Sequence, residues 1–388
     1  MSDQSISSLP VTQNQTWFRE LVSDALAHAK SLGASDAVAE VSESRGLSVA
    51  VRNDDVETVE QTRDRSLDVT VFAGQKRGSA STSDFSAKAL RETVEAAWHI
   101  ARYTAADPAA GLPEASELAT QFPDLQLHHV WDISAEEAAA LAIKAERAAR
   151  GVSPLITNSD GASVDTSEGH FVLGNSRGFM GGYPYSRHGL SVAPIAGKGA
   201  TMQRDYWYTS ARAAHDLADP ATVGRYAAER TLARLSARRI KTGRFPVLFE
   251  APVAIGLLGA LVQATSGGAL YRKASFLLDS LGKQVLADHL DVYEDPFIRG
   301  AMGSSMFDSE GVRTHARDVV VAGMLGGYFL STYTARKLNM KTTGNAGGSH
   351  NLRLSSRLTA PADDLDAMLK KWAPGFSSPS SLARGSIM

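Results

Sequence analysis

The spacing of apolar residues changes twice along the 388-residue chain, and each change limits the fold that the next segment can adopt. Helical and alternating patterns come first, short apolar runs broken by turn residues follow, and strand and helix patterns joined by glycines come last. The chain is also too long for one ordinary hydrophobic core. We therefore expect an α+β protein with an N-terminal α/β domain (residues 1–110), a central α+β domain with antiparallel hairpins (residues 125–240) and a β-rich C-terminal domain with glycine-rich loops (residues 241–371).

The N-terminal domain shows two helical patterns and two strand patterns. Apolar residues recur every three or four positions over residues 16–31 and 86–103, which predicts helices there. Apolar and polar residues alternate over residues 47–52 and 67–72, which predicts strands. The stretch TAADPAAGLPEAS, residues 104–116, is rich in Pro, Ala and Gly and is typical of a linker.

The central domain begins and ends with helix-start signals. Ser134 and Glu137 have the spacing of a capping box, which predicts a helix directly after them. Asp219 followed by Pro220 predicts a second helix that runs to about residue 239. Between them, residues 154–208 carry short β-like runs broken by Gly, Asn, Asp and Ser, which predicts antiparallel hairpins.

Composition excludes several function classes. The formal net charge of −2 argues against a general nucleic-acid binder. The chain has no cysteine, so disulfides, thiolate metal sites and a cysteine nucleophile are excluded. No apolar run reaches the roughly 18 residues of a membrane span, and the polar start of the chain differs from a signal peptide. We expect a cytoplasmic protein.

The segment EAPVAIGLLGALVQATSGG, residues 250–268, is almost wholly apolar. Pro252 can begin a helix, and the Ser-Gly-Gly sequence at residues 266–268 can end one. The run FPVLF, residues 245–249, precedes it and predicts a buried strand. A buried helix after a buried strand often carries catalytic groups, yet only Gln263 and Thr265 are polar in its interior.

Two glycine-rich stretches are candidate functional loops. GNSRG, residues 174–178, matches the nucleophile elbow of serine hydrolases, but no helix pattern follows Ser176, so a hairpin turn is favoured. TGNAGGSHN, residues 343–351, fits neither the phosphate-binding loop nor the dinucleotide fingerprint. We interpret it as a constrained loop near a functional surface, with a phosphate site as the alternative. His350 is its only group that titrates near neutral pH, and a structural or exposed histidine is favoured.

Two further clusters could bind metal. ADHLDVYED, residues 287–295, gathers Asp288, His289, Asp291, Glu294 and Asp295, although a solvated acidic loop is the commoner explanation. His128 and His129 are neighbours that cannot turn both rings to one metal from a strand, and we interpret them as surface residues. No His-Glu-x-x-His motif occurs in the chain.

Three long stretches resemble the TldD/PmbA family, and most closely its PmbA (TldE) branch. They are ALYRKASFLLDSLGKQV at residues 269–285, FDSEGVRT at residues 307–314 and YTARKLNMKTTGNAGGSHNLRL at residues 333–354. The resemblance implies a cytoplasmic metallopeptidase pair of two homologous subunits that degrades peptides or small unfolded proteins, matures a peptide antibiotic and acts on an antitoxin. It also implies the description "modulator of DNA gyrase", which we expect to reflect an indirect link.

In that family, the TldD subunit binds zinc through a His-Glu-x-x-x-His helix. The corresponding positions here carry Gly259, Ala260 and Ala264, which offer neither a metal ligand nor a general base. The resemblance therefore implies a chain without catalytic residues or zinc of its own, which works with a zinc-bearing TldD-type partner. We expect Arg272, His350 and Asn351 to face the peptide substrate or that partner, and we expect no contact with nucleic acid or membrane.

Two alternatives remain open. The chain could be a self-sufficient metallopeptidase with ligands such as His289, Asp291 and His350, or a regulatory binding protein without proteolytic function. The resemblance ends after Lys371, and the tail WAPGFSSPSSLARGSIM, residues 372–388, can be encoded by the DNA of the family sequence read one base out of frame. We expect a frameshift near Lys371, a C-terminal domain that is incomplete, and a free sheet edge.

Overall fold

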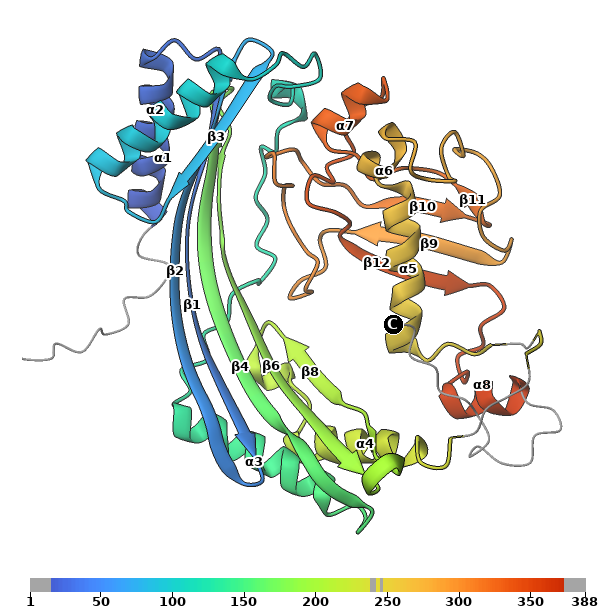
Figure 1. Ribbon diagram of the computed structural model, residues 1–388. Coiled ribbons are helices and arrows are strands. Elements are labelled where there is room, and N and C mark those ends of the chain that lie inside the picture. The colour runs from blue at the N-terminus through green and yellow to red at the C-terminus, as the bar shows by residue number, and fades with distance from the viewer. Residues whose placement is uncertain (1–14, 238–241, 245–246, 373–388) are drawn as a thin grey trace, which may run out of the picture.

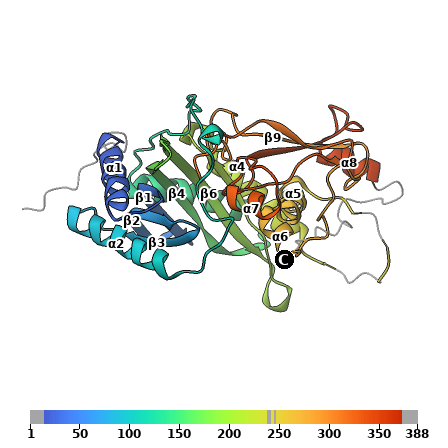
Figure 2. The ribbon, with the colours of Figure 1, turned by 90° about the horizontal axis from the view of Figure 1, so that it is seen from above.

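The computed structural model describes residues 15–237, 242–244 and 247–372 (Figure 1). A long curved sheet forms one side of the molecule, and a separate C-terminal unit faces its concave side (Figures 1 and 2). The N-terminal and central domains that the sequence predicted share this one sheet. Strand β1 of the first pairs with strand β4 of the second along most of its length. The linker at residues 104–116 therefore separates stretches of sequence that belong to one sheet.

The large sheet has the order β3-β2-β1-β4-β6-β7, with β5 on β4 and β8 on β6, and all of its pairs are antiparallel. This confirms the antiparallel hairpins expected for residues 154–208. The strand bounds are β1 Asp36–Arg52, β2 Asp55–Ala73, β3 Lys76–Thr82, β4 Ile156–Asn175, β5 Met180–Gly181, β6 Pro184–Ala196, β7 Gln203–Arg204 and β8 Trp207–Ala211.

Two helix pairs cover one face of this sheet. Helices α1 (Gln15–Ser31) and α2 (Ala87–Tyr103) pack at one end, and α3 (Ala135–Arg150) and α4 (Pro220–Ala233) pack at the other (Figure 1). Val41 lies in the first core and Val49 in the second. Both are odd-numbered residues of β1, so the two cores lie on the same face. The opposite, concave face is left to polar side chains and to the C-terminal unit.

The predicted helix starts are present. Ser86 accepts a hydrogen bond from the backbone N–H of Ala89, and the capping box of Ser134 and Glu137 is complete. Asp219 caps α4, but this helix ends at Ala233 rather than near residue 239. Both strands are longer than predicted: β1 begins at Asp36, well before residue 47, and β2 begins at Asp55, directly after the hairpin turn.

The C-terminal unit contains a four-stranded sheet with the order β11-β10-β9-β12. Helix α5 packs on its core through Leu258, Leu261 and Val262. Strand β12 is the last strand on its side among the described residues. The remaining bounds are α5 Ala251–Thr265, α6 Gly267–Tyr271, α7 Thr332–Lys337, α8 Leu365–Trp372, β9 Leu290–Asp295, β10 Arg317–Val321, β11 Met324–Leu325 and β12 Asn351–Ser356, with short 3₁₀ turns at Ala115–Glu117, Gly199–Thr201 and Ala214–Asp216.

Three expectations for this unit were wrong. Helix α5 is present but not buried: only Thr265 is fully enclosed, and Ile255 is 63% exposed. Residues 247–250 form no strand, and Val247 is 65% exposed. Residues 290–295 form β9, an inner strand of the sheet, instead of a solvated loop, because Val292 and Glu294 point into the interior.

Two further expectations concern the ends of the chain and the membrane. The proposed out-of-frame tail lies outside the described residues from residue 373 onward. Within the described residues, no helix combines the length and the apolar character that crossing a membrane requires.

Candidate functional site

A crevice of about 380 Å³ lies where the C-terminal unit meets the concave face of the large sheet. The sheet contributes Glu40 to its lining, Tyr183 lies between β5 and β6, and Arg212, directly after β8, adds a cation. The C-terminal unit contributes the glycine-rich loop that ends at His350. Segments that are far apart in sequence therefore share one concave surface.

An aromatic seam holds the two sides of this crevice together. The ring of Phe307 lies 5.6 Å from that of Tyr183, 6.0 Å from Phe171 and 5.0 Å from Phe179, in edge-on contacts. The Tyr183 hydroxyl is 2.9 Å from Oγ of Ser305. Burial raises the pKa of Tyr183. The motif FDSEGVRT, which begins at Phe307, thus belongs to the contact between the units.

The glycine-rich loop is shaped by backbone angles and by one buried carboxylate. Gly347 and Gly348 have φ of 107° and 118°, which side-chain-bearing residues rarely adopt. A Cβ on Gly347 would come within 2.8 Å of Oγ of Ser309. Asp308 accepts the backbone N–H of Ala346 at 2.9 Å and so ties the loop to the preceding turn. The expectation of a constrained loop is therefore met by its geometry.

His350 is the predicted site residue that reaches the crevice. Its side chain is 9% exposed, and its Nδ1 lies 3.0 Å from Oε1 of Glu294. Burial alone would raise the pKa of Glu294, but hydrogen bonds from His350 and the charge of Arg317 lower it to about 2. Arg317 donates to the second oxygen of Glu294 at 2.7 Å. The imidazole is thus oriented by a buried, ionised carboxylate.

Asn351 and Arg272 have other surroundings. The Asn351 amide accepts the N–H of Gly303 at 2.9 Å and donates to Oγ of Ser304 at 2.7 Å, so it fixes the loop that forms one wall of the crevice. Arg272 follows helix α6, is exposed, and holds its guanidinium 5.4 Å from the ring centre of Tyr271. It is not among the residues that line the crevice.

Three charged residues of the crevice were not among the candidates predicted from the sequence. Burial and the nearby Asp68 raise the pKa of Glu40. Burial and the charge of Glu310 raise the pKa of Asp308 to about 6. Arg212 donates to the backbone oxygen of Met302 at 2.9 Å. Glu40 and Arg212 lie in ordinary polar contexts in the sequence, and Asp308 lies in the stretch FDSEGVRT, where no role was assigned to it. Only the packing of the C-terminal unit against the sheet brings the three together.

The other predicted candidates have structural partners. Ser176 lies in a turn between β4 and β5, as expected, and its hydroxyl donates to Oδ1 of Asp36 at 2.7 Å. Nε2 of His128 lies 2.8 Å from Oε2 of Glu168, and Nε2 of His129 lies 3.1 Å from a backbone oxygen. Both histidines are half-buried and lie outside any strand, so the assumption that they lie on a strand was wrong.

The described residues do not fit a zinc site. On α5, Gly259 and Ala260 are exposed and Ala264 is half-buried, and none of these side chains has a donor atom. His289 and His350 lie at opposite ends of the β9–β12 pair, so one ion cannot contact both. In the part of the chain that the structure describes, no group of three or more His, Asp or Glu side chains is arranged to hold a metal ion.

Comparison with known proteins covers almost the whole chain. Models of the three domains of the PmbA/TldA metallopeptidases match residues 37–101 (domain 1), 128–235 (central domain) and 242–376 (C-terminal domain). The metalloprotease PmbA of Escherichia coli O157:H7 is 46% identical over 92% of this chain and 78% of its own length. A PmbA homologue of Haemophilus influenzae is 42% identical over the same shares of the two chains.

A solved structure agrees with this assignment. A protein of Bacteroides thetaiotaomicron described as a modulator of DNA gyrase superposes with a TM-score of 0.82 and 27% identity, over 87% of this chain and 77% of that one. The fold, the three matched domains and the identity to the curated relatives lead to one conclusion. The chain belongs to the PmbA/TldD family of metallopeptidases.

Proposed function

We propose that this chain is the PmbA-type (TldE-type) subunit of a metallopeptidase pair that acts on peptides or small unfolded proteins, and that it binds no zinc itself. A homologous TldD-type subunit holds the zinc and performs the hydrolysis. This chain completes the chamber in which the peptide is held. The cytoplasm is the compartment in which we expect the pair to work.

The observation that carries the proposal is the chemistry of helix α5. At the positions that the family resemblance assigns to zinc ligands and base, the helix carries Gly259, Ala260 and Ala264. Zinc in proteins is bound by imidazole, carboxylate or thiolate, and activation of its water needs a nearby base. These three side chains supply neither.

The crevice supports the remaining role, which is to hold substrate. His350 is oriented by Glu294, and the lining adds hydroxyls, an exposed glycine-rich backbone and the guanidinium of Arg212. Such groups can bind the polar backbone of a peptide, whereas no nucleophile with an adjacent base lines this wall. We therefore assign substrate positioning, not bond cleavage, to this chain.

The test is a peptidase assay on an unfolded peptide with zinc quantified in the same samples. The chain is assayed alone and mixed with the TldD-type protein of the same genome. We expect activity and stoichiometric zinc only in the mixture. Activity with stoichiometric zinc in this chain alone would overturn the proposal.

A variant of His289 tests the alternative in which this chain is a metallopeptidase with zinc ligands of its own. Among the described residues, His289 contacts Oγ of Ser356 at 2.9 Å and no carboxylate, so His289→Asn should leave the zinc content and activity of the mixture unchanged. If His289→Asn removed zinc, His289 would be a ligand, and the assignment of a zinc-free subunit would fail.

A further inference from the structure

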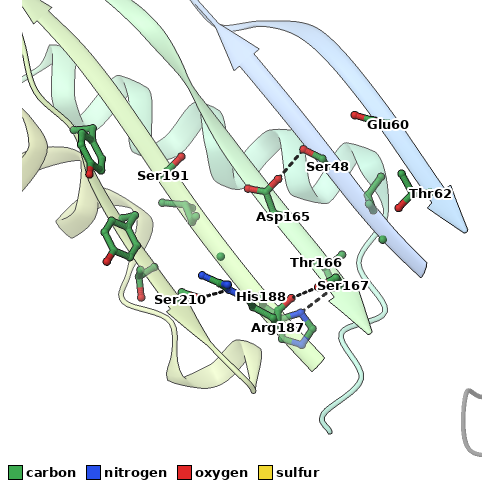
Figure 3. A pocket seen from close by; sticks show the side chains of 17 residues that line it. Ser48, Glu60, Thr62, Asp165, Thr166, Ser167, Arg187, His188, Ser191 and Ser210 are labelled. Atoms are coloured by element: carbon green, nitrogen blue, oxygen red, sulfur yellow. Dashed lines mark hydrogen bonds between the residues drawn. The ribbon is translucent and has the colours of Figure 1, made fainter. Parts of the chain in front are cut away.

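A second cavity, of about 580 Å³, lies on the concave face, and its lining shares no residue with that of the crevice (Figure 3). It is formed by β2, β1, β4, β6 and β8, and α3 lies behind the sheet in this view. On β4, Val164 is buried in the core beneath α3, whereas Asp165 and Ser167 are exposed on the other side. The cavity therefore belongs to the free, polar face of the sheet.

The floor of this cavity consists of small residues in register. Ser48 pairs with Asp165, Asp165 with Gly189, and Gly189 with Ser210, which makes one row across four strands. The next row contains Gly46, Ser167 and Arg187. Small floor residues let another chain approach the sheet closely, and their hydroxyls can replace the hydrogen bonds that a polar ligand makes with water.

Two tyrosines form the rim. Tyr206 and Tyr208 are 58% and 47% exposed, and their rings stack at 6.3 Å with an interplanar angle of 20°. Trp207 between them points the other way, onto the core and to within 5.1 Å of the guanidinium of Arg230. Both tyrosines line the cavity, Tyr208 from β8 and Tyr206 from directly before it, and their rings can cover a planar or cationic group.

The charges of the cavity have no ion-pair partners among the described residues. Glu60 lies on the row of Asp165, two strands away, and is exposed. Asp165 accepts hydrogen bonds from Ser48 at 2.7 Å and Ser163 at 3.0 Å. Arg187 donates to Oγ of Ser210 at 3.2 Å. Two carboxylates against one guanidinium disfavour an anionic ligand, and the polar floor disfavours a lipid.

His188 contributes to the shape of the cavity but not to its net charge. Both of its ring nitrogens are engaged, Nδ1 at 2.8 Å from Oγ1 of Thr166 and Nε2 at 2.9 Å from the backbone oxygen of His129. Burial lowers its pKa. The net charge of the cavity is therefore set by Glu60, Asp165 and Arg187.

We propose that this cavity binds an extended, polar polypeptide segment through its arginine or lysine side chains, which Glu60 and Asp165 attract. The rings of Tyr206 and Tyr208, at the other end of the cavity, cover a planar or cationic group of the same segment. The identification of the ligand as a peptide rests on the proposed function. Arg187, across from Ser167, faces the backbone carbonyls of the same segment. The cavity thereby gives the subunit a preference for cationic stretches of an unfolded substrate.

The experiment measures binding to the purified full-length chain alone, by fluorescence anisotropy. The probe is a labelled twelve-residue Gly-Ser peptide with two adjacent arginines, and its matched probe carries citrulline in their place. We expect the arginine peptide to bind about tenfold more tightly, with an affinity that falls as salt is added. Equal binding of the two probes would overturn the proposal.

Matched double variants distinguish the effect of the cavity carboxylates from the effect of the net charge of the protein. Glu60→Gln with Asp165→Asn should abolish the preference for the arginine probe. Glu136→Gln with Glu229→Gln removes the same charge from α3 and α4 on the opposite face and should preserve it. If both double variants lost the preference equally, the effect would be long-range and the cavity would not be the site. Asparagine keeps an acceptor for the serines that contact Asp165, and a thermal melt of each variant checks the fold.

The outcomes also separate this inference from the proposed function. Because the TldD-type subunit is absent, a failure to bind the probe overturns the cavity proposal but leaves activity of the mixture as the test of the subunit role. Binding of maltohexaose that Tyr206→Ala removes, without binding of either peptide, would make the cavity a carbohydrate site and overturn the proposal.

Discussion

The most informative single residue is Asp308, which is 5% exposed and yet ionisable. Its carboxylate accepts the backbone N–H groups of Glu310, Val312 and Ala346 at 2.9 to 3.0 Å. These hydrogen bonds favour the ionised form, but burial and the charge of Glu310 outweigh them and raise its pKa to about 6. The turn and the glycine-rich loop are thus held by one buried carboxyl group whose ionisation is disfavoured.

This carboxyl predicts a specific pH dependence. Because its pKa is raised in the folded state from 3.8 to about 6, its contribution to stability is full below about pH 4 and is lost as the pH rises through 6. In urea unfolding, the native chain should gain ~1 kcal/mol from this group at pH 5 relative to pH 7.5. Asp308→Asn should lack that gain and be about 1–3 kcal/mol less stable at pH 5, since one backbone donor loses its acceptor. The same pH dependence in both proteins would contradict this account.

At the scale of elements, helix α3 clamps the hairpin between β1 and β2. Asn53 and Asp54 form the turn with φ of 52° and 70°, the left-handed pair that two-residue hairpins require. Both of their backbone N–H groups donate at 3.0 Å to the carboxylate of Glu146, which is fully buried. Arg150, one turn later, donates to the same carboxylate at 3.1 Å. One helical residue therefore fixes the turn of a hairpin that comes earlier in the chain.

Replacing this carboxylate should loosen the turn. Glu146→Gln leaves one oxygen for two N–H donors, so we expect a loss of about 1–3 kcal/mol in the free energy of unfolding. Hydrogen exchange of the amides of Asn53 and Asp54 should accelerate more than that of the β4 amides. Glu136→Gln, on an exposed position of the same helix, is the control and should change neither. Unchanged exchange in Glu146→Gln would mean that the turn holds without the clamp.

Local signals in the sequence were enough to predict most helices, but not the longer strands or the contacts between distant segments. Helix caps such as Ser86 and Ser134 leave a local signal, because a cap contacts only residues that are close to it in sequence. Residues 55–65 of β2 are exposed throughout, so they lack the alternation that marks a half-buried strand. The partnership of Glu146 with the hairpin, and of His350 with Glu294, depends on packing that no local pattern contains.

At the scale of the whole molecule, apolar surface is concentrated on the C-terminal unit. Helix α5 exposes 63% of Ile255 and 45% of Leu257, because only its other face packs on the sheet beneath it. Strand β12 ends that sheet among the described residues, and its Leu354 is 40% exposed. The sequence pattern indicated burial for α5 because hydrophobicity alone does not distinguish a core from a surface that associates with another chain.

This surface predicts self-association of the chain when it is produced alone. The mass measured by light scattering should rise with protein concentration for the unchanged chain. In the double variant Ile255→Lys with Leu257→Lys it should rise less, because charges on an exposed apolar face oppose contact between chains. Val56→Lys with Val59→Lys, at 51% and 52% exposure on the β1–β2 hairpin, is the matched control and should have little effect. Equal effects of the two double variants would mean that charge in general, not α5, governs association.

The pairing of β1 with β4 also sets an order of events during synthesis. Val51 of β1 pairs with Ala162 and Val38 pairs with Asn175, more than a hundred residues later in the chain. On the ribosome, β1 can close its hairpin with β2 at once, but its other edge has no partner until β4 has emerged, and such distant pairings form slowly. The hydroxyl and charged side chains along the middle of β1 can keep this unpaired edge from forming strand pairs with other nascent chains.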